Sequence, residues 1–135
     1  MSSEPRAEIA TVFERYPRAP RQRLLQLRKL LLQTAKRLDG VGEIEECLRW
    51  GQPSYLTTAS GSGSMVRLHW SESLGQRVGL YVHCQTRLLS EYRARYPEFD
   101  YEGNRALLIP VTGKLARVEL ADCMGLALTY RLRRK

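Results

Sequence analysis

The stretches MVRLHW (residues 65–70) and VGLYVH (residues 78–83) decide the fold class, because apolar and other side chains alternate along both of them. Alternation with a period of two is typical of strands that bury one face of a sheet. The segment between them, from Ser71 to Arg77, is short enough to connect a hairpin. We therefore predict two neighbouring antiparallel strands near the middle of the chain.

The apolar faces of these two stretches fix the register of the hairpin, because a slip of one residue would expose every apolar side chain. The predicted pairs are Val66 with Val82, Leu68 with Leu80, Arg67 with Tyr81, and Met65 with His83. Helices must then cover the apolar face. The opposite face is predicted to carry Arg67, His69, Tyr81 and His83.

Helices are predicted on the N-terminal side of this hairpin. Apolar residues recur at helical spacing from Ala7 to Tyr16 and from Pro20 to Leu38, and Pro17 ends the first of these segments. A third, short helix is predicted from Gly42 to Trp50, and a strand from Ser54 to Ala59. The broad apolar side of the second helix is predicted to contain Leu24, Leu25, Leu27, Leu30, Leu31, Leu32, Ala35 and Leu38.

The C-terminal side is predicted to contain a helix from Thr86 to Tyr96, a loop from Tyr101 to Asn104, a strand from Arg105 to Val111 and a helix from Val118 to Leu132. Pro110 should place the end of its strand at an edge or a bulge. This order of elements indicates an α+β fold, an antiparallel sheet of about five strands with helices packed on one face. The length suits one domain over residues 1–135.

The charge of the chain favours anionic partners. Lys and Arg total 22 against 14 Asp and Glu, which gives a net charge of +8. Such a surface attracts nucleic acid, anionic membranes or anionic metabolites, but charge alone carries no recognition geometry. We do not expect nucleic acid to be the partner, because no nucleic-acid-binding motif is visible. We expect no membrane partner either, because no apolar run approaches the roughly 20 residues that span a bilayer.

A cytoplasmic location is expected from the cysteines and the N-terminus. Three widely spaced cysteines, without a Cys-x-x-Cys pair, do not suggest a disulfide framework. The first residues, MSSEP, lack the basic and apolar regions of a secretory signal. The chain is expected to act as a monomer or a homodimer.

Arg28 stands out because it lies inside the leucine side of the second helix, between Leu24 and Leu31. A buried guanidinium needs an anionic or carbonyl partner. The alternative is that its long side chain reaches past the leucines to the surface. We predict that Arg28 is at least half buried and lies within hydrogen-bonding reach of residues 52–55 or of a bound anion. With a neighbouring carboxylate it would be a structural pair.

The stretch RWGQPSY (residues 49–55) raises a second question, whether it is only a corner of the fold or the wall of a binding site. In the first interpretation Gly51 and Pro53 turn the chain while Trp50 and Tyr55 pack in the core. In the second, the polar groups of this stretch line a concave site for an anion, together with arginines that match carboxylate or phosphate oxygens. The predicted ligand-binding residues are Arg28, Trp50, Gln52, Ser54, Tyr55, Arg67, Tyr81, His83, Asn104 and Arg105.

No catalytic motif names a reaction, and we predict no cofactor. His69 and His83 are possible metal ligands, but Cys84 should face away from His83 on a strand, so a shared metal site is not predicted. The Gly/Ser run from Ser60 to Ser64 is predicted to be a flexible turn. It is not a phosphate-binding loop, because no lysine-serine pair and no helix follow it.

Several short motifs occur in an order that resembles the domain of unknown function 1801 family, also called YdhG-like. They are Tyr16-Pro17, Leu27-Arg28, Glu45-Glu46, the stretch Trp50-Gly51-Gln52-Pro53-Ser54-Tyr55, His83-Cys84-Gln85-Thr86 and Gly103-Asn104-Arg105. The likeness runs from about residue 8 to residue 132, and the Trp-Gly-x-Pro-x-Tyr stretch is its most specific part. The resemblance implies a cytoplasmic α+β domain and supplies no reaction. The function expected from the residues is therefore binding of an anionic small molecule or an acidic peptide on the polar sheet face, without catalysis.

One branch of that family is similar to frataxin, and this gives an alternative function in iron binding and delivery. Frataxin-type proteins present carboxylates on an early helix, because iron ions prefer oxygen donors. Here the first two helices are basic, and the acidic cluster is Glu43, Glu45 and Glu46. We predict no specific iron site, and a stoichiometric site, if found, would point to that cluster.

Overall fold

The computed structural model describes residues 4–134, which form an α+β domain with one antiparallel sheet. The strand order is β1-β2-β3-β4-β6-β5. The helices are α1 (Ala7–Arg15), α2 (Arg18–Arg37), α3 (Leu88–Arg95) and α4 (Arg117–Leu128). The strands are β1 (Glu45–Arg49), β2 (Gln52–Leu56), β3 (Val66–His69), β4 (Arg77–Val82), β5 (Asp100–Glu102) and β6 (Ala106–Pro110). Two short 3-10 helices span Glu72–Leu74 and Leu132–Arg134.

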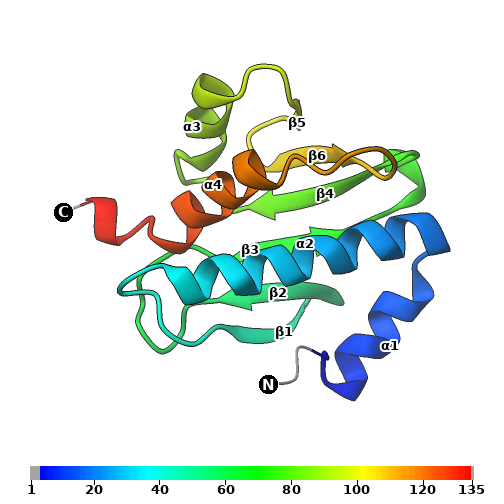
Figure 1. Cartoon of the computed structure of the whole chain (residues 1–135), viewed down its shortest axis with the longest axis horizontal. Coiled ribbons are helices and arrows are strands. Elements are labelled where there is room, and N and C mark those ends of the chain that lie inside the picture. The colour runs from blue at the N-terminus through cyan, green and yellow to red at the C-terminus, as the bar shows by residue number, and fades with distance from the viewer. Residues whose placement is uncertain (1–3, 135) are drawn as a thin grey trace.

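All four α-helices of the described chain lie on one side of the sheet or at its end (Figure 1). The helices α2 and α4 run side by side across the sheet, α1 packs against α2 and β2, and α3 packs against α4. We call the side under α2 and α4 the inner face and the opposite side the outer face. Within residues 4–134 no α-helix covers the outer face, as the hairpin alternation predicts.

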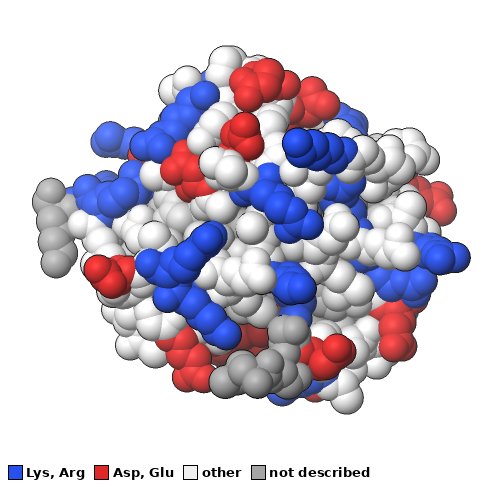
Figure 2. Space-filling view, in the orientation of Figure 1, with Lys and Arg blue, Asp and Glu red and all other residues white. Residues whose placement is uncertain are grey.

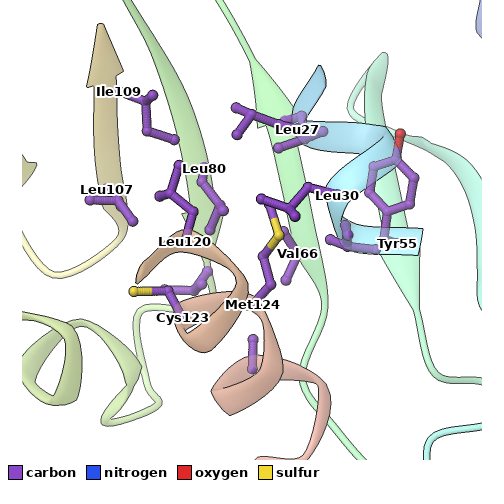
Figure 3. Packing of buried hydrophobic residues seen from close by; sticks show 14 of the residues in the cluster. Leu27, Leu30, Tyr55, Val66, Leu80, Leu107, Ile109, Leu120, Cys123 and Met124 are labelled. Atoms are coloured by element: carbon purple, nitrogen blue, oxygen red, sulfur yellow. The ribbon is translucent and has the colours of Figure 1, made fainter. Parts of the chain in front are cut away.

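The core lies between the inner face and the helices (Figure 3). Leu27 and Leu30 of α2, and Leu120 and Met124 of α4, point toward the same strands. From the sheet they meet buried side chains of β2, β3, β4 and β6: Tyr55, Val66, Leu80, Leu107 and Ile109. Burial of this apolar surface away from water provides most of the free energy that holds the helices on the sheet.

The predicted hairpin register is confirmed. Val66 pairs with Val82, Arg67 with Tyr81, and Leu68 with Leu80. The ladder ends at Val66 and Val82, so the predicted pair of Met65 with His83 lies beyond it. Pro110 follows the last residue that β5 pairs, Leu108, so it lies at an open edge on that side, as predicted.

Residues 42–50 are not a helix, and this prediction is wrong. They contain β1, which pairs with β2 over Glu45–Arg49. The alternation was hidden because the middle inner-face residue of β1 is charged: Glu46 lies between Ile44 and Leu48 on that face. A carboxylate among the apolar residues of one face removes the alternation of apolar and polar side chains from a short segment. The sequence of this segment therefore did not distinguish a strand from a helix.

Three further predictions need correction. The segment predicted as the loop 101–104 begins within β5, a three-residue strand too short to show a period. Leu25 is 37% exposed rather than part of the buried side of α2. The last helix ends at Leu128 instead of continuing to Leu132.

The Gly/Ser run from Ser60 to Ser64, predicted as a flexible turn, lies at this end of α4 and makes hydrogen bonds to it. It covers the C-terminus of α4, where the last carbonyl groups of a helix need donors. Ser62 Oγ donates to the Leu128 carbonyl at 2.7 Å, and Ser64 N–H donates to the Ala127 carbonyl at 2.9 Å. The run is a cap for α4 rather than a linker.

Candidate functional site

The predicted ligand-binding residues divide between the two sides of the sheet, because successive residues of a strand face opposite ways. Arg28 and Tyr55 lie on the inner face, buried under α2. Gln52, Ser54, Arg67 and Tyr81 occupy outer-face positions of three neighbouring strands, and Trp50 reaches the same side by contacting Arg67. One site containing all ten residues is therefore not formed.

On the inner face, Arg28 forms a bidentate ion pair with Glu46. Its Nε donates to Oε2 at 2.6 Å and its Nη2 donates to Oε1 at 2.9 Å, and Arg28 is only 6% exposed. The Tyr55 hydroxyl also donates to Oε2, at 2.8 Å. The prediction that Arg28 is buried near residues 52–55 is confirmed, and the carboxylate makes it a structural pair rather than an open anion site.

The protonation of this cluster follows from burial and from Glu46. Burial acts to lower the pKa of Arg28, but the hydrogen bonds and charge of Glu46 outweigh it and raise that pKa. Burial, followed by the negative charge of Glu46, raises the pKa of Tyr55 well above its ordinary value. The tyrosine therefore keeps its proton and remains a donor. The cluster ties β1 and β2 to the middle of α2.

On the outer face, the guanidinium of Arg67 lies between two aromatic rings. Its Cζ is 5.0 Å from the centroid of the Trp50 ring and 5.2 Å from that of Tyr81. Arg67 Nη1 also donates to Oε1 of Gln52. Stacking on both sides holds the side chain in place, and each cation–π contact adds about 0.5–1 kcal/mol at exposed sites.

The position of Tyr81 depends on Gly79, two residues earlier in β4. A Cβ atom at Gly79 would lie 2.4 Å from the Tyr81 ring, so the ring lies over the backbone where a side chain would otherwise stand. Next to it, the Tyr16 hydroxyl shares a 2.9 Å hydrogen bond with His69 Nδ1. Burial, and then the charge of Arg67, lower the pKa of His69, so this histidine favours its neutral form.

Trp50 has an unusual backbone. Its φ is 54°, and it is the one residue other than glycine with a positive φ among residues 4–134. Gly51 follows with a φ of 72°, so the two residues form the two-residue turn between β1 and β2 that normally favours Asn-Gly. A bulky side chain there costs about 1–2 kcal/mol. Trp50 is nevertheless 76% exposed, so burial of its ring does not offset that cost.

A hollow of about 200 Å³ opens beside this turn. Its lining residues are Trp50, Met65, Arg67, Val82, His83, Cys84 and Arg105. No carboxylate lies within 4 Å of the Arg67 or Arg105 guanidinium in the described part of the chain. Burial lowers the pKa of Arg67, contact with Tyr81 opposes this, and the positive charge of Arg105 lowers it further. Two arginines that form no ion pair with a described carboxylate thus face one small hollow.

The other predicted residues support the surrounding backbone. Ser54 is buried, and its Oγ donates to the Gln52 carbonyl at 2.9 Å. Asn104 Nδ2 donates to the Cys84 carbonyl at 3.2 Å. His83 is exposed at the hollow, and its Nδ1 accepts the Gln85 N–H at 3.1 Å. Only His83 of these three offers the hollow a side-chain group.

The residues considered for metal binding are dispersed. His69 is engaged by Tyr16, and Glu45 and Glu46 lie on opposite faces of β1 because they are adjacent in a strand. Within residues 4–134 no group of three or more His, Cys, Asp or Glu side chains is arranged to hold a metal ion. The iron prediction itself stays a prediction.

Sequence reasoning missed Glu46 as the partner of Arg28. The sequence did contain a sign of this pairing. In a strand, Glu46 shares a face with Ile44 and Leu48, so it is an acidic residue that points toward the core. Treating the segment as a helix concealed it.

Nothing matches. Comparison with protein-family models, with curated proteins and with solved structures finds no similar protein for this chain. The resemblance to the domain of unknown function 1801 family therefore stays a prediction, and the geometry of the site carries the functional argument. None of the helices in residues 4–134 is both long and apolar enough to cross a membrane.

Proposed function

We propose that this protein binds a small anion with a flat ring on the outer face of its sheet. Arg67 and Arg105 hold the anionic group, and the exposed ring of Trp50 stacks against the flat part of the ligand. Arginine suits the first role because its planar donors match carboxylate and phosphate oxygens. The proposal involves binding and no reaction.

The conformation of Trp50 is the observation that carries this proposal. A strained residue persists only where something compensates for its cost, and such residues cluster at ligand-binding sites. One side of the Trp50 ring packs on Arg67, and an exposure of 76% leaves the other side to solvent. Asparagine or glycine would suit the turn better, so the turn itself does not account for a tryptophan at this position.

The size of the hollow favours a small molecule over an acidic peptide. About 200 Å³ is below the roughly 300–1,000 Å³ of ordinary ligand pockets, so it holds an anionic group while the ring of the ligand extends over Trp50. Cys47, Cys84 and Cys123 are all free, and Cys84 is exposed. We place the binding activity in the cytoplasm, where such a thiol stays reduced.

Fluorescence of Trp50 gives a direct test. The chain has two tryptophans, so Trp70→Phe leaves Trp50 as the single reporter. Adenosine monophosphate and benzoate, two flat anions, are titrated beside adenosine, which has a ring without the charge. We expect both anions to quench Trp50 and adenosine to bind at least about tenfold more weakly, a difference of 1.4 kcal/mol.

Matched arginine variants locate the site. Arg67→Met and Arg105→Met should each weaken binding by about tenfold or more, because each removes a charged hydrogen-bond donor. Arg77→Met changes an arginine on the same sheet face at the other end of β4 and should leave binding unchanged. Equal binding by all three variants, or no quenching by either anion up to about 10 mM, would contradict the proposal.

A variant of Trp50 separates binding from stability. Trp50→Asn should abolish stacking yet raise the free energy of unfolding by about 0.5–1 kcal/mol, since relief of strain exceeds the lost cation–π contact. Urea unfolding measures this. A loss of stability in this variant would show that the tryptophan serves the fold.

A further inference from the structure

The N-terminus of α4 lacks a capping side chain. Its first flanking residue is Ala116, which has no side chain able to accept a hydrogen bond. The N–H groups of Val118 and Glu119 find no acceptor within residues 4–134. Free N–H groups at a helix start carry partial positive charge and attract oxyanions. This end alone does not define a site.

Arg23 of α2 provides an independent observation at the same place. The residue is 5% exposed, and its Nε and Nη2 donate to the carbonyls of Val111 at 3.3 Å and Gly113 at 2.6 Å. Its Nη1 makes no hydrogen bond within the described residues. Since no fully buried side-chain nitrogen or oxygen there lacks a partner, Nη1 must reach the surface. A nearly buried, fixed guanidinium thus presents one open edge.

Arg23 has no carboxylate as a direct ion-pair partner in the described residues, because none of residues 4–134 places one within 4 Å of its guanidinium. Burial lowers the pKa of Arg23, and the positive charge of Arg117 lowers it further. An anion between these two arginines would remove their repulsion. Figure 2 shows Lys and Arg side chains over the region where α4 begins.

Two hollows adjoin at Arg23. The wider one, about 830 Å³, lies at the start of α4 and includes Lys114 and Arg117. The narrower one, about 220 Å³, is mainly apolar and is lined by Phe99, Leu108, Ile109, Leu115 and Leu120, among others. Arg23, Lys114, Leu115 and Ala116 border both. A single ligand therefore has access to both a cationic and an apolar environment.

We infer that Arg23 and the N-terminus of α4 bind the oxyanion of an amphipathic small molecule, a phosphate or carboxylate group joined to an apolar body that fills the narrower hollow. The acidic residues nearby fix the direction of binding. Glu98 and Asp100 line the narrower hollow, so they repel the anionic end toward Arg23. Glu119 lines the wider hollow and must turn away from the bound anion.

This site is separate from the outer-face site. Its residues come from α2, from β5 and the segment before it, from β6 and the segment after it, and from α4, and it shares no lining residue with the hollow beside Trp50. The two binding proposals can therefore be supported or refuted independently. Variants of one site serve as controls for binding at the other.

Amide NMR of the Arg67→Met protein, in which we expect outer-face binding to be weakened, tests the inference. Phenyl phosphate, inorganic phosphate and benzyl alcohol are titrated in turn. We expect phenyl phosphate to shift the Val118 and Glu119 amide signals and to bind at least about tenfold more tightly than inorganic phosphate. Benzyl alcohol should leave these two signals in place.

Two variants complete the test. Arg117→Met changes an exposed side chain and should weaken binding of phenyl phosphate about fivefold to tenfold with the fold intact. Arg23→Lys keeps the charge but loses the planar donor group, and it should weaken binding further. Unshifted Val118 and Glu119 signals, equal affinity for phosphate and phenyl phosphate, or unchanged binding by Arg117→Met would each overturn the inference.

Discussion

At the scale of single residues, the inner-face ion pair has the largest consequence for stability. Arg28→Leu leaves the carboxylate of Glu46 buried without its cation, so we expect the free energy of unfolding to fall by about 3–5 kcal/mol. Adding Glu46→Gln removes the stranded charge and keeps an acceptor for Tyr55. The double variant should recover at least half of the loss.

Urea unfolding of both variants, with Lys29→Leu as the control, measures this effect. Lys29 is the next residue of α2 and is exposed, so its substitution should change stability by about 0.5 kcal/mol or less. A double variant as unstable as Arg28→Leu alone would show that packing, and not the unpaired charge, sets the cost.

The same pair shows what the sequence can and cannot predict for a site. An arginine within a leucine stripe is visible in the sequence, and its burial follows from helical geometry. Its partner is 18 positions away in the chain and comes close only after β1 folds against β2. Candidate residues could therefore be named, but their division between two faces depended on assigning the strands correctly.

At the scale of elements, two glycines in the Gly/Ser cap of α4 differ in how much space a side chain would have. A Cβ atom at Gly63 would lie 2.3 Å from the Leu128 carbonyl oxygen, whereas Gly61 has a φ of +67° but nothing within 4 Å. We expect Gly63→Ala to destabilise the protein by about 3 kcal/mol or more through overpacking against backbone. Gly61→Ala should cost about 1 kcal/mol through strain alone.

Thermal unfolding of the two glycine variants, side by side, checks this order. The helical signal of α4 should weaken in Gly63→Ala before the rest of the chain unfolds. If both variants lose equal stability, then the cap does not hold the end of α4.

Elements with an unbroken alternation of apolar and polar residues were the ones that sequence analysis placed well. The register of β3 with β4 followed from matching the apolar faces of the two strands, Val66 and Leu68 against Leu80 and Val82. In contrast, β1 carries a charged residue on its inner face, and β5 has only three residues. Both β1 and β5 are held in place by pairing with a neighbouring strand. The short sequence of each strand does not encode that pairing.

At the scale of the whole molecule, the strand order predicts where the structure is hardest to open. β4 lies between β3 and β6, with both its edges paired, while β1 and β5 are the edge strands. Amide hydrogen exchange should therefore be slowest in β4, by on the order of a hundredfold or more relative to β1 and β5.

Exchange measured by NMR in the wild type and in Arg28→Leu tests this and links it to the inner-face pair. The substitution should accelerate exchange in β1 more than in β4, because the ion pair anchors β1 to α2. Uniform exchange across all six strands would mean that the sheet opens only as one unit.

The backbone of Trp50 also bears on how this protein changes over evolutionary time. Asparagine or glycine at this position relaxes the turn, so such substitutions should improve folding. Under the proposed function, selection for the ligand would oppose these substitutions. If the proposed binding is right, descendants without it should lose the tryptophan early and keep Gly51, so the residue at position 50 would distinguish the two kinds of lineage.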